Sequence, residues 1–306
     1  MKVLGIVVTY NGSIWIANCL ESLANSIMPL DVIVIDNQST DNTVSIIEHN
    51  FSDVCLYQSK ENLGFGKANN IGLRRVLEEK YDYAFLLNQD AWIAPDTIKV
   101  LTDTQQNDPA YGIISPLHVN AAKDKLDSKF IEYICQDPYK PFISDMVLNP
   151  NGLKDIYPVN FINAAAWLIS GKCVEAVGGF DPIFPHYGED NDYIQRAKYH
   201  QFKVGVCPKT SIVHDREGVV KQTDLKKSYA KHYVSSLKVL KNLEKPLSYT
   251  FFQWIGLQLR QLVKAMIRLD MAYGWMKVKL LFRVLANLGS IAKSRANSKN
   301  QMRAYL

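Results

Sequence analysis

Short apolar runs alternate with longer segments of helical periodicity through the first 118 residues of this chain. The runs are rich in Val and Ile, as strands are, and the segments between them carry apolar residues three or four positions apart, such as Ile16, Leu20 and Leu23. Each segment has room for a single helix, which is the connection that parallel strands require. The pattern therefore predicts a doubly wound α/β domain with a mostly parallel central sheet. Its strands are expected at residues 3–8, 32–35, 54–57, 83–87 and 112–114.

Charge is distributed unevenly along the 306 residues. The formal net charge is +5, but residues 241–306 contain 12 Lys or Arg against 2 acidic residues, which leaves residues 1–240 mildly acidic. We expect a catalytic domain over residues 1–222 and a basic, amphipathic helical region over residues 223–306. The domain would have two halves, 1–118 and 119–222, and the second would begin with an irregular insertion at residues 119–160. Further elements are expected as strands at 166–170, 204–206 and 211–213, a helix at 189–199, and helices from 225 onward.

Polar residues follow the first two predicted strands. Thr9, Tyr10 and Asn11 precede a glycine at the end of the first, where the backbone can approach a planar or phosphate ligand closely. Asp36 ends the second strand, and its carboxylate could accept from a base N–H or a ribose hydroxyl, although a turn aspartate is the simpler alternative. The residues 39–41 that follow suit the cap of the next helix.

Residues 61–70 combine two glycines, a lysine and three asparagines before a helix. Gly64, Asn69 and Asn70 suit contact with a ribose or a diphosphate near that helix N-terminus. The spacing is neither GxGxxG nor GxxxxGK[ST], which disfavours a dinucleotide-binding protein and excludes ATP hydrolysis by a P-loop.

Acidic residues mark three further places. Asp90 follows a buried strand in the run Asn88-Gln89-Asp90, where a carboxylate can hold Mg²⁺ or Mn²⁺ or can simply cap a turn. Glu189 and Asp190 stand together at the start of a predicted helix, where the helix dipole alone would favour acids. His214 ends a predicted strand and, taken alone, is an ordinary histidine.

Together these motifs resemble glycosyltransferase family 2, the inverting, nucleotide-sugar-dependent enzymes of the GT-A fold, and particularly its rhamnosyltransferase branch. The resemblance runs from Val3 to His214 and rests on VVTYNG, VIDNQSTDN, ENLGFGKANN, LLNQD, and GGFD followed by GEDND. It implies a single Rossmann-like GT-A domain plus a C-terminal helical segment, and transfer of a sugar from dTDP-rhamnose or a UDP-hexose to a glycan or lipid-linked acceptor. Bacterial surface polysaccharide synthesis is the implied setting.

The resemblance also implies roles for individual residues. The nucleotide would be bound by Thr9, Tyr10, Asn11, Asp36, Gly64, Asn69 and Asn70. Mg²⁺ or Mn²⁺ would be held by Asp90 and His214, with Asn88 in place of the first acid of the family's DxD motif. Asp190 would be the catalytic base, and Glu189 and Trp167 would bind the acceptor. A nucleotidyltransferase, or an inactive GT-A scaffold in which Asn88 reflects decay, remain the alternatives.

The basic helical region predicts an anionic partner. Residues 246–290 mix aromatic, aliphatic and cationic side chains, which is typical of helices lying on an anionic inner-membrane surface. The alternative is a helical hairpin that packs on the catalytic domain or forms a homodimer. Nucleic acid is disfavoured because no recognition motif accompanies the cations. The scattered cysteines and the lack of a signal peptide predict a cytoplasmic protein, with peripheral attachment to the inner face of the cell membrane if the tail binds lipid.

Overall fold

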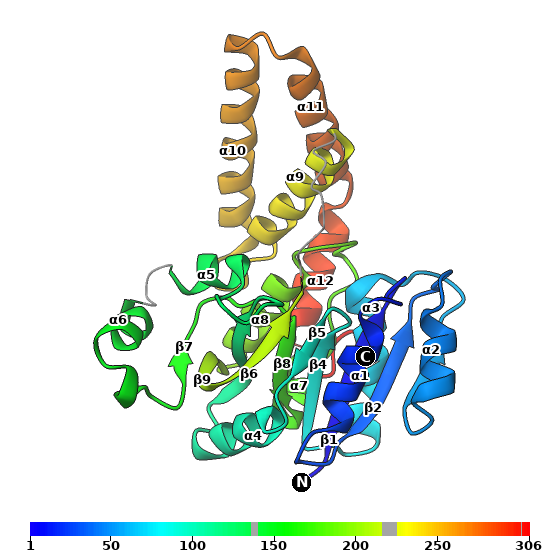
Figure 1. The fold of residues 1–306 in the computed structure, drawn as a ribbon. Helices are drawn as coiled ribbons and strands as arrows, with labels where there is room; N and C mark the ends of the chain where they lie inside the picture. The colour runs from blue at the N-terminus through cyan, green and yellow to red at the C-terminus, as the bar shows by residue number, and fades with distance from the viewer. Residues whose placement is uncertain (136–139, 216–224, 301) are drawn as a thin grey trace.

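The computed structural model describes residues 1–135, 140–215, 225–300 and 302–306, and its centre is a nine-stranded mixed sheet. The strand order is β3-β2-β1-β4-β8-β6-β9-β5, with β7 paired to β9. Helices cover both faces of the sheet, and four further helices project beyond it (Figure 1).

The first half of the sheet is parallel, as the sequence predicts. Strands β3, β2, β1 and β4 pair in parallel in that order, and one helix joins each consecutive pair in the chain. Helix α1 buries the predicted stripe of Ile16, Leu20 and Leu23. The bounds are β1 Val3–Thr9, α1 Ile16–Ala24, β2 Asp31–Asp36, α2 Thr43–Asn50, β3 Cys55–Gln58, α3 Gly64–Glu78 and β4 Tyr83–Asn88.

The second half is mixed. Strand β8 runs antiparallel between β4 and β6, whereas β9 is parallel to β6, so β5, β7 and β8 oppose the other six strands. Two short strands were expected at 204–206 and 211–213, but this is wrong: β9 is one strand, with an irregularity where its register against β6 shifts after Cys207. The bounds are β5 Ala91–Ile93, α4 Thr97–Asn107, β6 Tyr111–Val119, β7 Tyr157–Pro158, β8 Ala166–Ser170, α7 Gly171–Val177, α8 Glu189–Tyr199 and β9 Lys203–His214.

The segment 119–160 is more regular than its sequence predicts. Its described residues include helices α5 (Ser128–Ile134) and α6 (Lys140–Leu148), the 3₁₀ turn Pro150–Gly152 and strand β7 (Tyr157–Pro158). The Asp127 carboxylate accepts hydrogen bonds from two backbone N–H groups of α5, and Phe130 anchors this helix in the core. Helices this short present too few periodic positions to be recognised from a polar sequence.

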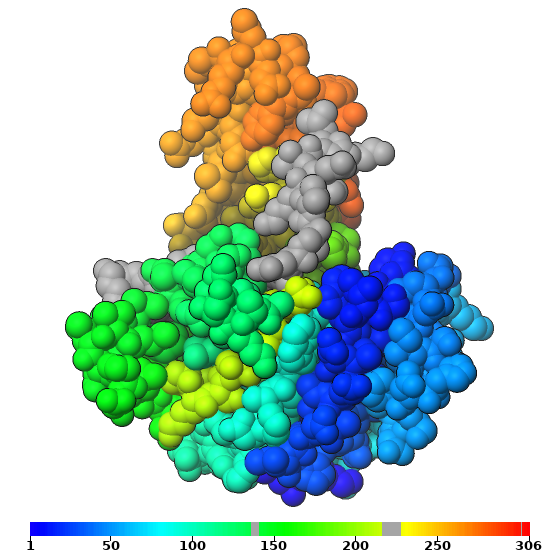
Figure 2. Space-filling model, in the orientation of Figure 1, coloured from blue at the N-terminus to red at the C-terminus, as the bar shows by residue number. Residues whose placement is uncertain are grey.

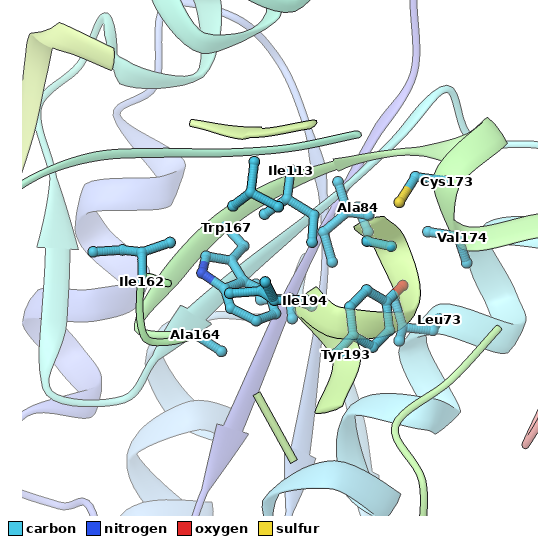
Figure 3. Packing of buried hydrophobic residues seen from close by; sticks show 14 of the residues in the cluster. Leu73, Ala84, Ile113, Ile162, Ala164, Trp167, Cys173, Val174, Tyr193 and Ile194 are labelled. Carbon is cyan, nitrogen blue, oxygen red and sulfur yellow. The ribbon is translucent and has the colours of Figure 1, made fainter. Parts of the chain in front are cut away.

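Alternate residues of the central strands face two hydrophobic clusters. Leu4 and Ile6 of β1 belong to one cluster, and Val3 and Val7 belong to the other, as the two-residue period of a strand requires. Trp167 and Tyr193 lie in the first cluster, where β8 and α8 meet (Figure 3). The sheet is therefore buried on both faces, and its strand ends are fixed in position.

The C-terminal region is a helical bundle. Helices α10 and α11 form a hairpin that stands away from the sheet (Figures 1 and 2). A third cluster, with Leu237, Trp254 and Leu280 among its members, also includes Phe184, which belongs to the part of the chain that carries the sheet, called the sheet domain below. The expected boundary at 222/223 lies outside the described residues. The bounds are α9 Leu225–Leu240, α10 Leu247–Ile267, α11 Met271–Ala286 and α12 Leu288–Asn300.

The last residues of the chain contact the sheet domain again. The Gly179 N–H donates to the Ala304 carbonyl at 2.7 Å, and Arg303 pairs with Glu175 at 2.8 Å. Gly178, at φ +79°, lies so close to Ala304 that there is no room for a Cβ. Among the described helices, none has the length and apolar character needed to cross a bilayer.

We predict that Gly178→Ala lowers the free energy of unfolding by about 1–3 kcal/mol, because the side chain would meet Ala304 and force a strained backbone. Gly256→Ala is the matched control. Gly256 lies in α10, and a Cβ added there would have no other atom within 4 Å, so alanine should stabilise by about 0.5–1 kcal/mol. Denaturant unfolding measures the free energy of unfolding of both variants. Equal values for the two variants would contradict the close contact between Gly178 and Ala304.

Candidate active site

Three neighbouring strands end at the same edge of the sheet. Thr9 of β1 pairs with Asp36 of β2, and the preceding residue of β1 pairs with Asn88 of β4. These strands run toward the side from which α10 and α11 project (Figure 1). Ligands of open α/β sheets bind at the carboxyl ends of strands, so this edge is the candidate site.

Gln89 organises the turn after β1. Its Oε1 accepts from the Thr9 hydroxyl at 2.6 Å and from the Tyr10 N–H at 2.9 Å. Asn11 adopts φ +48°, a conformation that asparagine tolerates, and its Oδ1 accepts from the Thr40 N–H at 2.8 Å. Thr9 is fully buried and the Tyr10 side chain is exposed. Of the two, only Tyr10 presents a surface to a ligand.

The predicted cap of α2 is wrong in its details. Asn42 is the N-cap and makes no capping hydrogen bond, while Asp41 accepts from the backbone of Ser13 and Thr43. Burial alone would raise the pKa of Asp41, but the hydrogen bonds from the side chains and backbone of Thr43 and Ser13 together outweigh it and lower the pKa to about 2. The cluster therefore joins the turn after β1 to α2.

Asp36 is 2% exposed at the end of β2. Its Oδ2 accepts from the Ser39 N–H at 3.0 Å, whereas no described group donates to its buried Oδ1. A buried carboxylate oxygen without a donor is costly in the free protein. The site can accept one N–H or O–H from a ligand.

The start of α3 lies beside this edge. Asn37 joins the two, because its side chain bonds the Leu63 N–H and the Gly64 carbonyl. Asn69 donates to the Phe65 carbonyl, and both polar atoms of the Asn70 amide bond the backbone of Phe180.

Both asparagines are thus buried and engaged by the protein, with Asn70 joining α3 to the loop before α8. Their contact with a nucleotide stays a prediction, as does that of Gly64, which begins α3 at φ +75°.

Asp90 and His214 meet although 124 positions separate them in the chain. His214 Nε2 lies 3.4 Å from Asp90 Oδ1, because the antiparallel pairing of β5 with β9 sets Ala91 opposite His214. The Asp90 side chain is 26% exposed and that of His214 is buried. No group of three or more metal-ligating side chains occurs in the described ranges. A carboxylate and an imidazole can hold a divalent cation whose shell is completed by phosphate and water, so the pair fits such an ion.

Glu189 and Asp190 begin α8 after a left-handed Gly188. Burial raises the pKa of Glu189, and its buried Oε2 has no partner among the described residues. Burial and then the neighbouring Glu189 charge raise the pKa of Asp190 to about 6, against smaller opposing effects of the Asn191 N–H and Lys238. A carboxylate of this kind is ionised near neutral pH and still basic enough to accept a proton.

The opposite side of α8 is held by ion pairs. Arg196 Nε bonds Asp192 Oδ2 at 2.7 Å, and both side chains are fully buried. Lys241 Nζ lies 2.6 Å from Asp181 Oδ2 and 3.4 Å from Asp192 Oδ1. The helix that carries Asp190 is therefore fixed partly by a lysine at the end of the helical region's first helix.

Trp167 is fully buried in β8 and contacts Phe180 and Tyr193 (Figure 3). Its Nε1 has no hydrogen-bond partner among the described residues. Its assignment to the acceptor site stays a prediction. Glu189 lies next to the first turn of α3, because a Cβ on Gly66 would come within 3.8 Å of the Glu189 Cβ.

Three residues with roles at this site were not found by sequence reasoning. Gln89 lies inside a recognised motif, but of that motif only Asp90 was predicted to bind the metal, and Gln89 was given no role. Lys238 and Lys241 are two of many lysines near the basic end of the chain, and only a long-range contact map could have distinguished them.

Comparison with known proteins agrees with this geometry. The sequence profile described as "Glycosyl transferase family 2" matches residues 6–168. The chain is 24% identical over 200 residues to the low-salt glycan biosynthesis hexosyltransferase Agl10 of Haloferax volcanii, covering 65% of this chain and 62% of that protein. It is 23% identical over 234 residues to the N-acetylglucosaminyl-diphospho-decaprenol L-rhamnosyltransferase of Mycobacterium tuberculosis, covering 69% and 75%. The chain thus spans about six tenths of the haloarchaeal relative's length.

Two solved structures share the fold. Residues 1–349 of TarS from S. aureus, in complex with UDP-GlcNAc, give a TM-score of 0.57 at 17% identity over 82% of this chain and 69% of that one. Mannosyltransferase PcManGT from Pyrobaculum calidifontis, with GDP-Man and Mn²⁺, gives 0.55 at 16% identity over 94% and 87%. These are glycosyltransferases of the GT-A fold, and the predicted fold class is confirmed.

Proposed function

The chain belongs to glycosyl transferase family 2, and on this premise we propose that it is an inverting transferase that moves a sugar from dTDP-rhamnose or a UDP-hexose to a glycan or lipid-linked acceptor. The observation that carries the proposal is Asp190, a half-buried carboxylate with a pKa of about 6, on a helix that begins beside the strand edge. Bacterial surface polysaccharide synthesis is the proposed setting.

The donor nucleotide would lie along the ends of β1 and β2. Asp36 Oδ1 is free to accept from the N–H of a pyrimidine base or from a ribose hydroxyl, and Tyr10 is exposed beside it. Neighbouring structures hold UDP, UDP-GlcNAc or GDP-Man, which supports a nucleotide-sugar donor here.

In the reaction, the acceptor hydroxyl attacks the anomeric carbon of the sugar while its proton passes to Asp190. The bond between that carbon and the diphosphate oxygen breaks, and its electron pair leaves with the diphosphate. A single displacement of this kind inverts the anomeric centre and needs no second nucleophilic carboxylate. Glu189, buried and with one oxygen unpartnered, could accept from another acceptor hydroxyl.

Mg²⁺ or Mn²⁺ would be held by Asp90 and His214, and when bound it would neutralise charge on the leaving diphosphate. Asn88 ends β4 at the same edge and can contribute only an amide oxygen. A GT-A neighbour solved with GDP-Man and Mn²⁺ supports a divalent cation.

The helical hairpin would meet an anionic inner-membrane surface. Helix α10 buries Trp254 and Ala265 inside the bundle, but on its opposite face Phe252, Leu259, Val263 and Met266 are more than half exposed. Exposed cations, including Arg260, Lys264 and Arg268, lie along one side of this stripe, and no acid lies between residues 245 and 269. A charged rim around exposed apolar residues is typical of interfacial helices. A homodimer through the same face is the competing arrangement.

We predict that Asp190→Asn lowers kcat by about 10²–10⁴ while donor affinity stays within about twofold, because only proton transfer is lost. In the wild type, activity should fall as the pH drops through about 6, since Asp190 must be ionised to accept the proton. Transfer assays from pH 5 to 9 and donor titration measure both effects. Unchanged transfer by the variant would overturn the base assignment, and donor binding without transfer by the wild type would favour the inactive scaffold.

Asp90→Ala should weaken Mn²⁺ binding at least tenfold in the presence of UDP, because the cation loses its carboxylate ligand. Calorimetric titration with Mn²⁺ measures the affinity, and thermal unfolding without metal checks that the fold is intact. Asp96→Ala, at the N-cap of α4, is the control and should bind Mn²⁺ normally. Full transfer activity in EDTA would refute the role of the metal.

Met266→Ser combined with Ile267→Ser should reduce binding to phosphatidylglycerol vesicles about tenfold or more, because two side chains that are 72% and 76% exposed would no longer insert. Val147→Ser with Leu148→Ser removes a similarly exposed pair from α6 and should bind normally. Vesicle co-sedimentation in low and high salt measures binding. A dimer that the first pair alone disrupts, without any vesicle binding, would contradict the membrane proposal.

A further inference from the structure

Helix α9 and the residue that follows it contact α8 through two lysines that lie three residues apart. Lys238 Nζ donates to Asn191 Oδ1 at 2.9 Å, and Lys241 Nζ bonds Asp181 and approaches Asp192. Both lysines line a small cavity between the two helices. A segment of the helical region therefore touches the helix that begins with Glu189 and Asp190.

Lys241 fixes where α9 lies. Its side chain is 1% exposed, and Nζ also bonds the hydroxyls of Ser294 and Ser298 on α12. A buried cation with three hydroxyl or carboxylate partners at 2.6–2.9 Å leaves little freedom for the helix that carries it. The position of α9 against α8 is thus set by buried groups, not by its exposed surface.

Lys238 is exposed and lies one helical turn before Lys241. Its partner Asn191 directly follows Asp190, and the Asn191 N–H donates to Asp190 Oδ1 at 2.8 Å. In the described residues, two charged side chains act on Asp190: Glu189 on the same helix opposes its ionisation, and Lys238 from α9 favours it.

We propose that α9 is a positioning element of the acceptor site, in which Lys238 is a positioning residue that is fixed by its bond to Asn191, so that its charge lies near Asp190 and favours the ionised carboxylate of this base. The inference rests on the proposed role of Asp190. It gives the helical region a part in the reaction that does not depend on any membrane.

The test is the titration of Asp190 in the full chain, by NMR of protein labelled at the aspartate carboxyl carbon, with Asp190→Asn to assign the signal. Lys238→Met should raise the titration midpoint of Asp190 by about half a pH unit at low ionic strength, because a favourable charge is removed. Once a donor is turned over by the wild type, kcat/KM of this variant at pH 5.5 should be about threefold lower, with no change above pH 8.

Two variants separate positioning from a general loss of charge or stability. Lys238→Arg keeps the cation and should restore the wild-type midpoint, while Lys231→Met removes an exposed lysine of α9 about 10 Å away along the helix and should leave it unchanged. A wild-type midpoint in Lys238→Met, or an equal shift in Lys231→Met, would overturn the inference. Because the midpoint is read without catalysis, a failed base assignment in the transfer assay would be distinguishable from a failed positioning role.

Discussion

Buried ion pairs hold the sheet domain and the helical region together: they join Lys241 and Arg196 to Asp181 and Asp192. All four side chains are at most 2% exposed, and they come from α8, the loop before it and the segment after α9. Removing charges from water costs several kcal/mol per ion, and this cost is offset only while each charge keeps its partners. Burial alone would raise the pKa of Asp181, but Lys241 and the Ser294 hydroxyl outweigh it and lower the pKa. This carboxylate therefore contributes stability above its unfolded pKa, and the contribution is lost as the pH falls through the lower folded value.

The same network divides the acids around α8 into two kinds. Asp181 accepts hydrogen bonds from Lys241 and Ser294, whereas Asp190, nine residues later, has Glu189 beside it and an exposed lysine that partly offsets the repulsion. Carboxylates whose surroundings move their pKa values in opposite directions commonly have different tasks. Here one kind holds the helix, and the other lies in its first turn, where we propose that the acceptor hydroxyl binds. Because the ion pairs fix one side of α8, Asp190 can keep its poorly solvated position on the other side.

Local patterns in the sequence were sufficient for the parallel part of the sheet and for the strand ends. Strands β1, β2 and β4 are apolar runs closed by polar residues, and because parallel strands end together, Thr9 and Asp36 had to be neighbours. The nearness of Asp90 and His214 followed only from the family resemblance, since the antiparallel pairing of β5 with β9 leaves no local signal. Helices α5 and α6 were missed because they are short and lie in a polar segment. The contact of Lys238 with α8 depends on the fold of two distant helices, so no spacing in the chain could predict it.

The charge imbalance of the tail also has a different meaning once its side chains are placed. Three of its twelve cations are buried, namely Lys241, Lys277 and Arg295. Lys241 pairs with the carboxylates described above, and Lys277 contacts His232. Arg295 donates to the backbone carbonyls of residues 240, 242 and 245. Burial lowers the pKa of Lys277 to about 8, so this side chain stays mostly charged at pH 7 and loses its proton as the pH rises through about 8. Nine cations remain, and those nearest the exposed apolar stripe of α10 are Arg260, Lys264 and Arg268. Because charge attraction to a bilayer falls off within about 10 Å, those few cations, and not the total of the tail, determine where a membrane could be held.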